Sequence, residues 1–201
     1  MTSCRQGRPG GVSRCEPCRL IVIGASWGGL HAVGEILAGL PADFRPTVLV
    51  VQHRAEDSDD LLAGLLDRRG PLPVREVEDK DPLSGAGVLV APAGYHVLVE
   101  PDHFELSTEA EVRFSRPSID VTLESAADAL GPELVGVVLT GANDDGAVGL
   151  AAVRARGGFA IVQNPKTAMV ATMPEAARGS AQVVAELPEI AALLTDMGAR
   201  A

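Results

Sequence analysis

The chain is poor in aromatic residues and has no excess of basic ones. Aromatic side chains make up 3% of its 201 residues, so aliphatic side chains must fill the interior. Aspartate and glutamate outnumber lysine and arginine by 27 to 17, and the formal net charge is −10. Because nucleic-acid binding depends on basic groups that replace counterions on the phosphates, we expect no nucleic-acid partner.

Long apolar runs are also missing. No stretch approaches the roughly 18 residues that a membrane-spanning helix needs, and the amino terminus lacks the apolar segment of a secretory signal. These absences predict a cytoplasmic protein that does not insert into a membrane.

Cysteine is confined to one end of the chain, at Cys4, Cys15 and Cys18. The surrounding Gly-, Arg-, Ser- and Pro-rich stretch predicts a disordered tail over residues 1–18, followed by a single domain over residues 19–201. Cys15 and Cys18 have the spacing of half a zinc site, but no second pair follows at metal-binding spacing. We therefore expect neither a metal nor a cofactor.

Apolar runs alternate with segments of helical periodicity over the rest of the chain. Strands are predicted at residues 19–24, 47–52, 74–77, 88–91, 97–100, 135–140, 159–163 and 183–185. Helices are predicted after residue 29, over 61–66 with Ser58 as a possible cap, and over 119–130 and 147–156. Several strands are apolar on both sides, which is typical of a parallel sheet covered on both faces. The pattern predicts a doubly wound α/β domain, with antiparallel hairpins in the turn-rich region 74–106.

Three residues with complementary chemistry follow three of the predicted strands. Ser26 lies in Gly24-Ala25-Ser26-Trp27-Gly28, at a strand-to-helix turn that exposes a hydroxyl. His53 ends the second strand, and Asp145 follows the strand that ends near Thr140. Ligands of open α/β sheets bind beyond the carboxyl ends of the strands, so these side chains can meet. Together they supply a nucleophile, a base and an orienting acid.

Each of these residues also has a structural interpretation. Ser26 could cap a helix, and a lone histidine at a strand end is usually a hydrogen-bonded surface residue. Asp144 and Asp145 could bind a divalent cation or cap the helix that begins near Ala147. The other histidines, His31, His96 and His103, are expected to be structural or solvated.

Several ordered blocks resemble the catalytic domain of the chemotaxis receptor methylesterases of the CheB type. They are Ile23–Gly29, Val51–His53, Ala91–Gly94, Arg116–Val121, Leu139–Ala147, Gln163–Pro165 and Met173–Ala177. The resemblance implies a parallel α/β fold and a triad of Ser26, His53 and Asp145, rather than Asp144. It also implies hydrolysis of glutamate methyl esters on the cytoplasmic helices of chemotaxis-type receptors, with deamidation of receptor glutamines as a related activity.

Two other assignments fit the sequence less well. An α/β-hydrolase places its acid between nucleophile and histidine, which would require His96 or His103 as the base. A dinucleotide-binding loop needs a G-x-G-x-x-G spacing that the run from Gly24 lacks.

The chain also departs from the family's pattern. Only about 18 residues precede the first predicted strand, where the family usually carries a receiver domain, so we expect no switching of that kind within this chain. Trp27 stands where the family commonly has threonine, and Ala142 and Asn143 replace a methionine and a glycine. Asn143 is expected to keep the turn by adopting a left-handed conformation. Backbone N–H groups near Trp27 and Ala142 are expected to hold the oxyanion.

These departures leave two alternatives open. One is a receptor-binding or regulatory module of the same fold with weak catalysis, and the other is an esterase for another carboxyl methyl ester.

Overall fold

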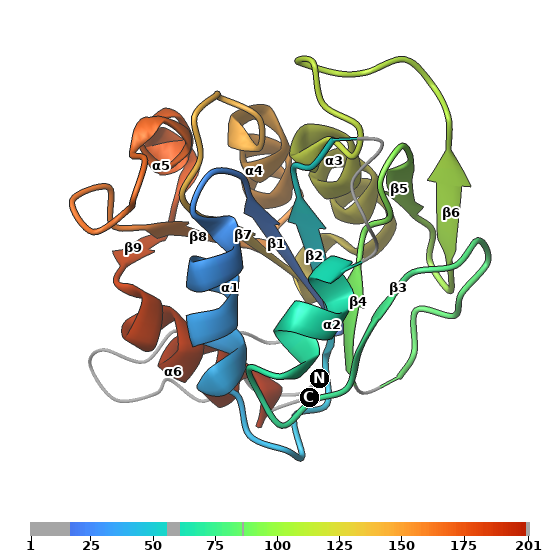
Figure 1. The fold of residues 1–201 in the computed structure, drawn as a ribbon, viewed down its shortest axis with the longest axis horizontal. Helices are drawn as coiled ribbons and strands as arrows, with labels where there is room; N and C mark the ends of the chain where they lie inside the picture. Colours follow the sequence, from blue (N-terminus) through green and yellow to red (C-terminus); the bar gives the residue numbers. More distant parts are fainter. Residues whose placement is uncertain (1–16, 56–60, 86, 200–201) are drawn as a thin grey trace, which may run out of the picture.

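A seven-stranded parallel sheet forms the centre of the molecule (Figure 1). The computed structural model describes residues 17–55, 61–85 and 87–199. The strand order is β3-β4-β2-β1-β7-β8-β9. Their bounds are β1 Leu20–Ala25, β2 Thr47–Gln52, β3 Val74–Glu76, β4 Gly87–Val90, β7 Leu134–Val138, β8 Phe159–Gln163 and β9 Val183–Ala185. The predicted doubly wound α/β fold is confirmed.

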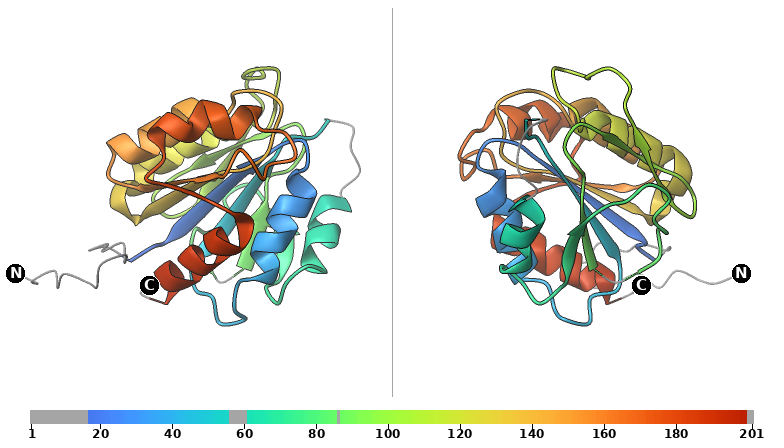
Figure 2. Two further views of the ribbon diagram at one scale, coloured as in Figure 1. Left: turned by 90° about the vertical axis from the view of Figure 1, so that its left-hand side faces the viewer. Right: turned by 45° about the vertical axis from the view of Figure 1, so that its right-hand side comes forward.

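Helices cover both faces of the sheet (Figure 2). One face carries α1 (Gly29–Ala38), α2 (Leu61–Asp67) and α6 (Leu187–Gly198). The other carries α3 (Ile119–Leu130), α4 (Ala147–Ala155) and α5 (Thr172–Ala177), with single 3₁₀ turns at Gly131–Glu133 and Arg178–Ser180. Alternate residues of β1 belong to two separate hydrophobic cores, one on each face. This is why the central strands are apolar at every position.

The region 74–106 differs from the prediction of antiparallel hairpins. One hairpin is confirmed: β5 (His96–Val99) and β6 (Phe104–Ser107) pair antiparallel in a separate two-stranded sheet, and a single antiparallel bridge joins Pro82 and His103. β3 and β4 pair parallel to each other, and β4 pairs parallel to β2. The residues between β3 and β4 are rich in turn formers. They are also numerous enough for the chain to cross from the carboxyl end of β3 to the amino-terminal end of β4, as parallel pairing requires. Turn-forming composition therefore predicted a hairpin where the chain makes a crossover without a helix.

The amino-terminal boundary also differs in part. Cys18, predicted to lie in the tail, is only 4% exposed and belongs to the core beneath α1, so that expectation was wrong for this residue. Cys4, Cys15 and the rest of residues 1–16 lie outside the described residues, as does Ser58, and Pro17 is described and exposed. Within the described ranges, no helix is both long and apolar enough to cross a membrane.

The strand order places a crevice at the carboxyl ends of the central strands. From β1 the chain builds the sheet in one direction through β2 and β4, and later in the opposite direction through β7, β8 and β9. The carboxyl ends of β1 and β7 therefore lie side by side where the winding reverses. In open parallel sheets such a reversal point is where ligands bind.

Candidate active site

Ser26 and His53 lie next to each other because their strands are adjacent and in register. Ala25 pairs with Gln52 at the ends of β1 and β2, and the His53 N–H donates to the Ala25 carbonyl at 3.0 Å. On the other side, the Ser26 N–H donates to the Thr140 carbonyl at 2.9 Å. The residue after β1 is thus fixed between the ends of the two neighbouring strands.

His53 is hydrogen-bonded to Asp145. The distance from His53 Nε2 to Asp145 Oδ2 is 2.7 Å, and the two side chains are 10% and 0% exposed. Asp144 instead lies at the surface and forms an ion pair with Arg113. The structure therefore brings together the imidazole and the carboxylate that the sequence paired. Within the described residues, the Ser26 hydroxyl makes no hydrogen bond.

The amino terminus of α3 holds the Asp145 carboxylate. Its oxygens accept hydrogen bonds from the Ser118 hydroxyl at 3.0 Å, from the Ile119 N–H at 2.7 Å and from the Asp120 N–H at 2.9 Å. Burial would raise the pKa of Asp145, but the hydrogen bonds from His53 and from this backbone outweigh it and hold the pKa below its ordinary value. Asp145 therefore stays ionised and keeps His53 in one orientation.

A second buried aspartate supports the loop that carries Asp145. Asp120 accepts hydrogen bonds from the N–H groups of Gly146 and Gly149, at 2.8 and 2.7 Å, and from Arg113 Nε at 3.1 Å. Burial and the nearby charge of Asp145 raise the pKa of Asp120. It fixes the start of α4 relative to α3. The sequence does not reveal this role of Asp120, because a single carboxylate in a helix carries no local sign of burial.

Two polar side chains, also missed from the sequence, fix the turn around Ser26. Gln52 Nε2 donates to the Ser26 carbonyl at 2.8 Å. Thr140 Oγ1 donates to the Trp27 carbonyl at 2.8 Å and accepts from the Val170 N–H at 2.9 Å. Gln52 ends β2, and Thr140 lies two residues beyond β7; both are buried. A polar side chain is unexpected at such a position unless it has partners, and that position was the available signal.

The turn after β7 approaches Ser26 too closely for a larger residue than glycine. A Cβ atom on Gly141 would lie 1.8 Å from Met173 Sδ and 2.9 Å from Ser26 Cβ. Asn143 does not adopt the expected left-handed conformation; its side-chain oxygen instead accepts the Asp145 N–H at 3.2 Å. An Asx turn therefore replaces the flexibility that a glycine would supply.

The remaining histidines have structural partners. His96 is buried, with Nδ1 accepting the Ser118 N–H at 3.1 Å and Nε2 3.1 Å from the Ala110 carbonyl oxygen. His31 is near Glu35, and His103 contacts Asp102 and Glu105. With both nitrogens of His96 engaged, it cannot serve as the base that the α/β-hydrolase order would require.

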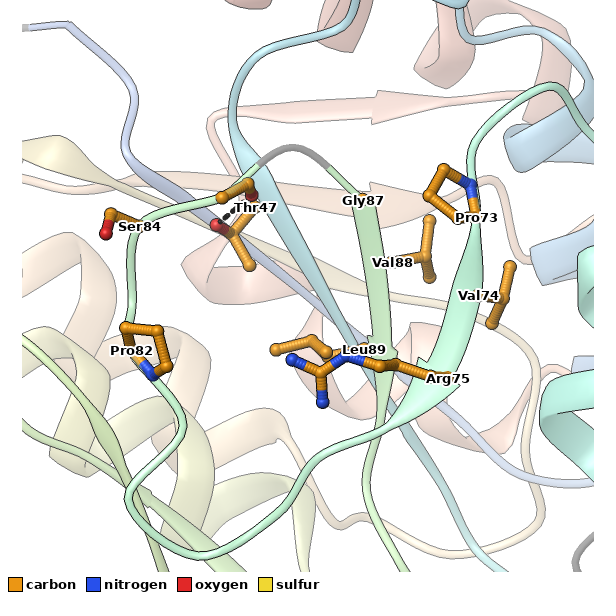
Figure 3. A pocket seen from close by; sticks show the side chains of 10 residues that line it. Thr47, Pro73, Val74, Arg75, Pro82, Ser84, Gly87, Val88 and Leu89 are labelled. Atoms are coloured by element: carbon orange, nitrogen blue, oxygen red, sulfur yellow. Dashed lines mark hydrogen bonds between the residues drawn. The ribbon is translucent and has the colours of Figure 1, made fainter.

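Cavities flank the site on both sides. One of about 500 Å³ is lined by Ser26 and by residues of α1 and α2, and one of about 320 Å³ by His53 and Phe114. A smaller cavity of about 160 Å³ lies at the amino-terminal ends of the strands, between Thr47 and the start of β4 (Figure 3). The carboxyl ends of the parallel strands thus carry a hydroxyl, a buried imidazole–carboxylate pair and space beside them, which are the groups that serine hydrolase chemistry requires of an α/β protein.

Comparison with known proteins gives the family. Residues 21–194 match the CheB methylesterase family, and the chain belongs to it. A putative protein-glutamate methylesterase/protein-glutamine glutaminase of Leptospira interrogans is 43% identical over 176 residues, which cover 86% of this chain and 91% of that protein. The protein-glutamate methylesterase/protein-glutamine glutaminase of Symbiobacterium thermophilum is 41% identical, and the match covers 89% of this chain but only 50% of that protein.

A solved structure agrees with this assignment. The catalytic domain of the Thermotoga maritima CheB methylesterase superposes with a TM-score of 0.86 at 30% identity, covering 90% of this chain and all of that domain. The chain thus corresponds to a methylesterase catalytic domain over nearly its whole described length.

Proposed function

We propose that this chain hydrolyses methyl esters of glutamate side chains on chemotaxis-type receptors, with Ser26, His53 and Asp145 as the catalytic residues. The observation that carries the proposal is the buried His53–Asp145 hydrogen bond next to the exposed turn at Ser26. Family membership supports the substrate class. Deamidation of receptor glutamines uses the same acyl chemistry, with ammonia in place of methanol as the leaving group.

The proton path follows from the ring geometry. His53 Nε2 is hydrogen-bonded to Asp145, so Nδ1 is the ring nitrogen that takes the Ser26 proton. Ser26 Oγ attacks the ester carbonyl, the tetrahedral intermediate collapses, and His53 returns the proton to the departing methoxide as methanol. Water activated by His53 then hydrolyses the acyl-enzyme to the carboxylate and regenerates the hydroxyl. Asp145 stabilises the imidazolium in both steps.

The oxyanion requires N–H donors near Ser26. Among the described residues, the N–H groups of Trp27 and Ala142 donate no hydrogen bond within the protein, and both lie in turns beside Ser26. We assign the oxyanion site to these two groups. One such donor is worth about a hundred- to a thousandfold in rate.

The receptor is proposed as the partner, and the cytoplasm as the location, because receptor methylation sites of this kind lie on cytoplasmic helices. A weakly catalytic receptor-binding module remains the second candidate, favoured by Trp27, which is 69% exposed at the mouth of the site. An esterase for another carboxyl methyl ester is the third.

Methanol release from methylated receptor fragments tests the proposal. Ser26→Ala should abolish turnover, and a serine-directed phosphonate should label wild type stoichiometrically but not the variant. Ser84→Ala is the matched control, because Ser84 is an exposed serine that lines the cavity at the amino-terminal ends of the strands, away from Ser26 (Figure 3). Receptor binding without labelling or hydrolysis would favour the binding module, and turnover that survives Ser26→Ala would refute the nucleophile.

A further inference from the structure

The cavity beside Ser26 combines basic side chains with an apolar wall. His31, Arg54 and Arg69 line it, and no carboxylate is found among its described lining residues. Four leucines complete the lining, namely Leu30, Leu61, Leu62 and Leu65. Its volume of about 500 Å³ lies within the range of roughly 300–1,000 Å³ that small-ligand sites occupy. A basic cavity is unusual in a chain whose formal net charge is −10.

Arg54, the residue after the proposed base, is a buried cation with unused donors. Its side chain is 8% exposed, and Nη2 pairs with Glu76 on β3. Nε and Nη1 are buried and have no partner in the described part of the chain. A buried donor left without a hydrogen bond costs about 1–3 kcal/mol, and more when it is charged. Such a group is expected where a ligand supplies the missing acceptor.

Arg69 adds a second cation to the lining of the cavity. It follows α2 and is exposed, and its side chain lies over α1, where a Cβ on Gly34 would be 3.2 Å from Arg69 Cγ. No ion pair involves Arg69 within the described ranges. Two guanidinium groups therefore border one cavity, and Ser26 lies at that cavity's edge.

We propose that this cavity is an anion subsite, in which Arg54 and Arg69 bind a second carboxylate that the substrate polypeptide carries close to its methyl ester. The inference rests on the proposed function and deepens it, because it specifies which esters are preferred. Guanidinium groups match carboxylates in geometry as well as charge. The leucines accommodate the methylene stem of an acidic side chain. A free glutamyl ester without an acidic neighbour would leave Nε and Nη1 of Arg54 without an acceptor.

Two synthetic helical peptides test the subsite. Both carry one glutamate γ-methyl ester, and they differ only in having glutamate or glutamine one helical turn away. Wild type should hydrolyse the glutamate peptide with about tenfold higher kcat/KM, as expected for a charge-assisted hydrogen bond. The difference should lie in KM, because the contact is made equally in the ground and transition states. It should shrink as ionic strength rises.

Variants assign the preference to particular residues. Arg54→Met should make the two peptides equal, and Arg54→Lys should keep part of the preference because it retains charge but loses the planar fork. Arg69→Met, at an exposed position that does not threaten folding, should reduce the preference. Arg68→Met is the matched control, since Arg68 is exposed and is absent from this cavity's lining; it should leave the preference intact.

Three outcomes would overturn the proposal. A wild type with no preference, or a preference that survives both Arg54→Met and Arg69→Met, would remove the subsite while leaving the esterase activity in place. If the preference for the glutamate peptide appears only after Glu56, Asp57, Asp59 and Asp60 are changed to amides, the chain's own carboxylates, and not the substrate's, are the partners of the arginines. Hydrolysis of neither peptide, together with failure of Ser26 labelling, would instead refute the proposed function.

Discussion

Two histidine–aspartate pairs in this molecule have the same hydrogen-bond length and opposite surroundings. His53 and Asp145 are 2.7 Å apart and nearly buried, with 10% and 0% of their side chains exposed. His103 and Asp102 are also 2.7 Å apart, but 29% and 85% exposed, and they are neighbours in sequence at the β5–β6 turn. Distance alone does not distinguish them.

The difference lies in what fixes each carboxylate. Asp145 is held by the Ser118 hydroxyl and by two backbone N–H groups of α3, so its position does not depend on the histidine. Asp102 is open to water, which competes for its oxygens and screens its charge. Only the first pair can hold an imidazole in a defined orientation beside a nucleophile. An isolated His–Asp contact is therefore weak evidence of a catalytic site unless burial and neighbouring donors accompany it.

The largest expected contrast comes from removing each histidine. His53→Ala should lower kcat/KM for a methyl-ester substrate by at least about ten-thousandfold, since it removes the proposed general base. His103→Ala should change it by less than about twofold. Steady-state methanol release from the two purified variants measures this. Comparable losses in both, with folding intact by circular dichroism, would show that the two pairs are not functionally distinct.

A neutral isostere of each aspartate should give the next largest contrast. Asp145→Asn should lower kcat by about a thousand- to ten-thousandfold with little change in KM, because the amide cannot stabilise the imidazolium and favours the wrong tautomer. Asp102→Asn should leave both constants unchanged. Full activity of Asp145→Asn would remove the orienting acid from the mechanism.

Ser118→Ala should have an intermediate effect. It deletes the hydroxyl that donates to Asp145 and that caps α3 through the Val121 N–H. The free energy of unfolding should fall by about 1–2 kcal/mol, and kcat by roughly tenfold or less because two backbone donors still hold Asp145. Urea denaturation and methanol release report the two effects. Ser125→Ala, within the same helix but away from Asp145, should cost stability without lowering kcat.

The smallest contrast is in pH dependence, where the two pairs have opposite signs. The pKa of Asp145 is lowered on folding, so its contribution to stability is present above its unfolded value near pH 4 and is lost as pH falls through the folded value. Hydrogen bonds that the His103 ring donates to the carboxylates of Asp102 and Glu105 raise the pKa of His103. Its contribution is present below about pH 6.5 and is lost as pH rises through the folded value.

Urea unfolding between pH 2 and pH 9 should separate these two contributions. Asp145→Asn should flatten the acid limb of the stability curve, and His103→Gln should remove a small decline above neutral pH. A decline above neutral pH that His103→Gln leaves unchanged would mean that another group causes it.

The strand-end rule let the sequence predict which residues could meet, but not how they are held. Ser26, His53 and Asp145 could be selected because each follows an apolar strand, and parallel strands share one edge. The partners of Asp145 come from α3, which is separated from it by β7 and a loop. No local pattern signals that the first turn of one helix will bind a carboxylate at the start of another.

The same limit applies to Arg54 and to strands β3 and β4. In sequence, Arg54 is an ordinary charged residue after a histidine, and only the packed fold shows that its donors are enclosed. β3 and β4 were predicted as strands, but their direction depends on the pairing of β4 with β2 and of β3 with β4, which are non-local contacts. The buried position of Cys18 was missed for a similar reason, because its neighbours in sequence are polar while its neighbours in space are core residues.

The sequence by itself determined the fold class, the alternation of strands and helices, and the candidate nucleophile, base and acid, because periodicity and residue chemistry are local properties of the chain. Tertiary structure alone decided that Asp145 is buried, ionised and held by α3, that Asp120 and Gln52 support the site, and that two arginines border a cavity beside Ser26. These features depend on burial and on contacts between distant segments, and both exist only after the sheet and its helices have packed together.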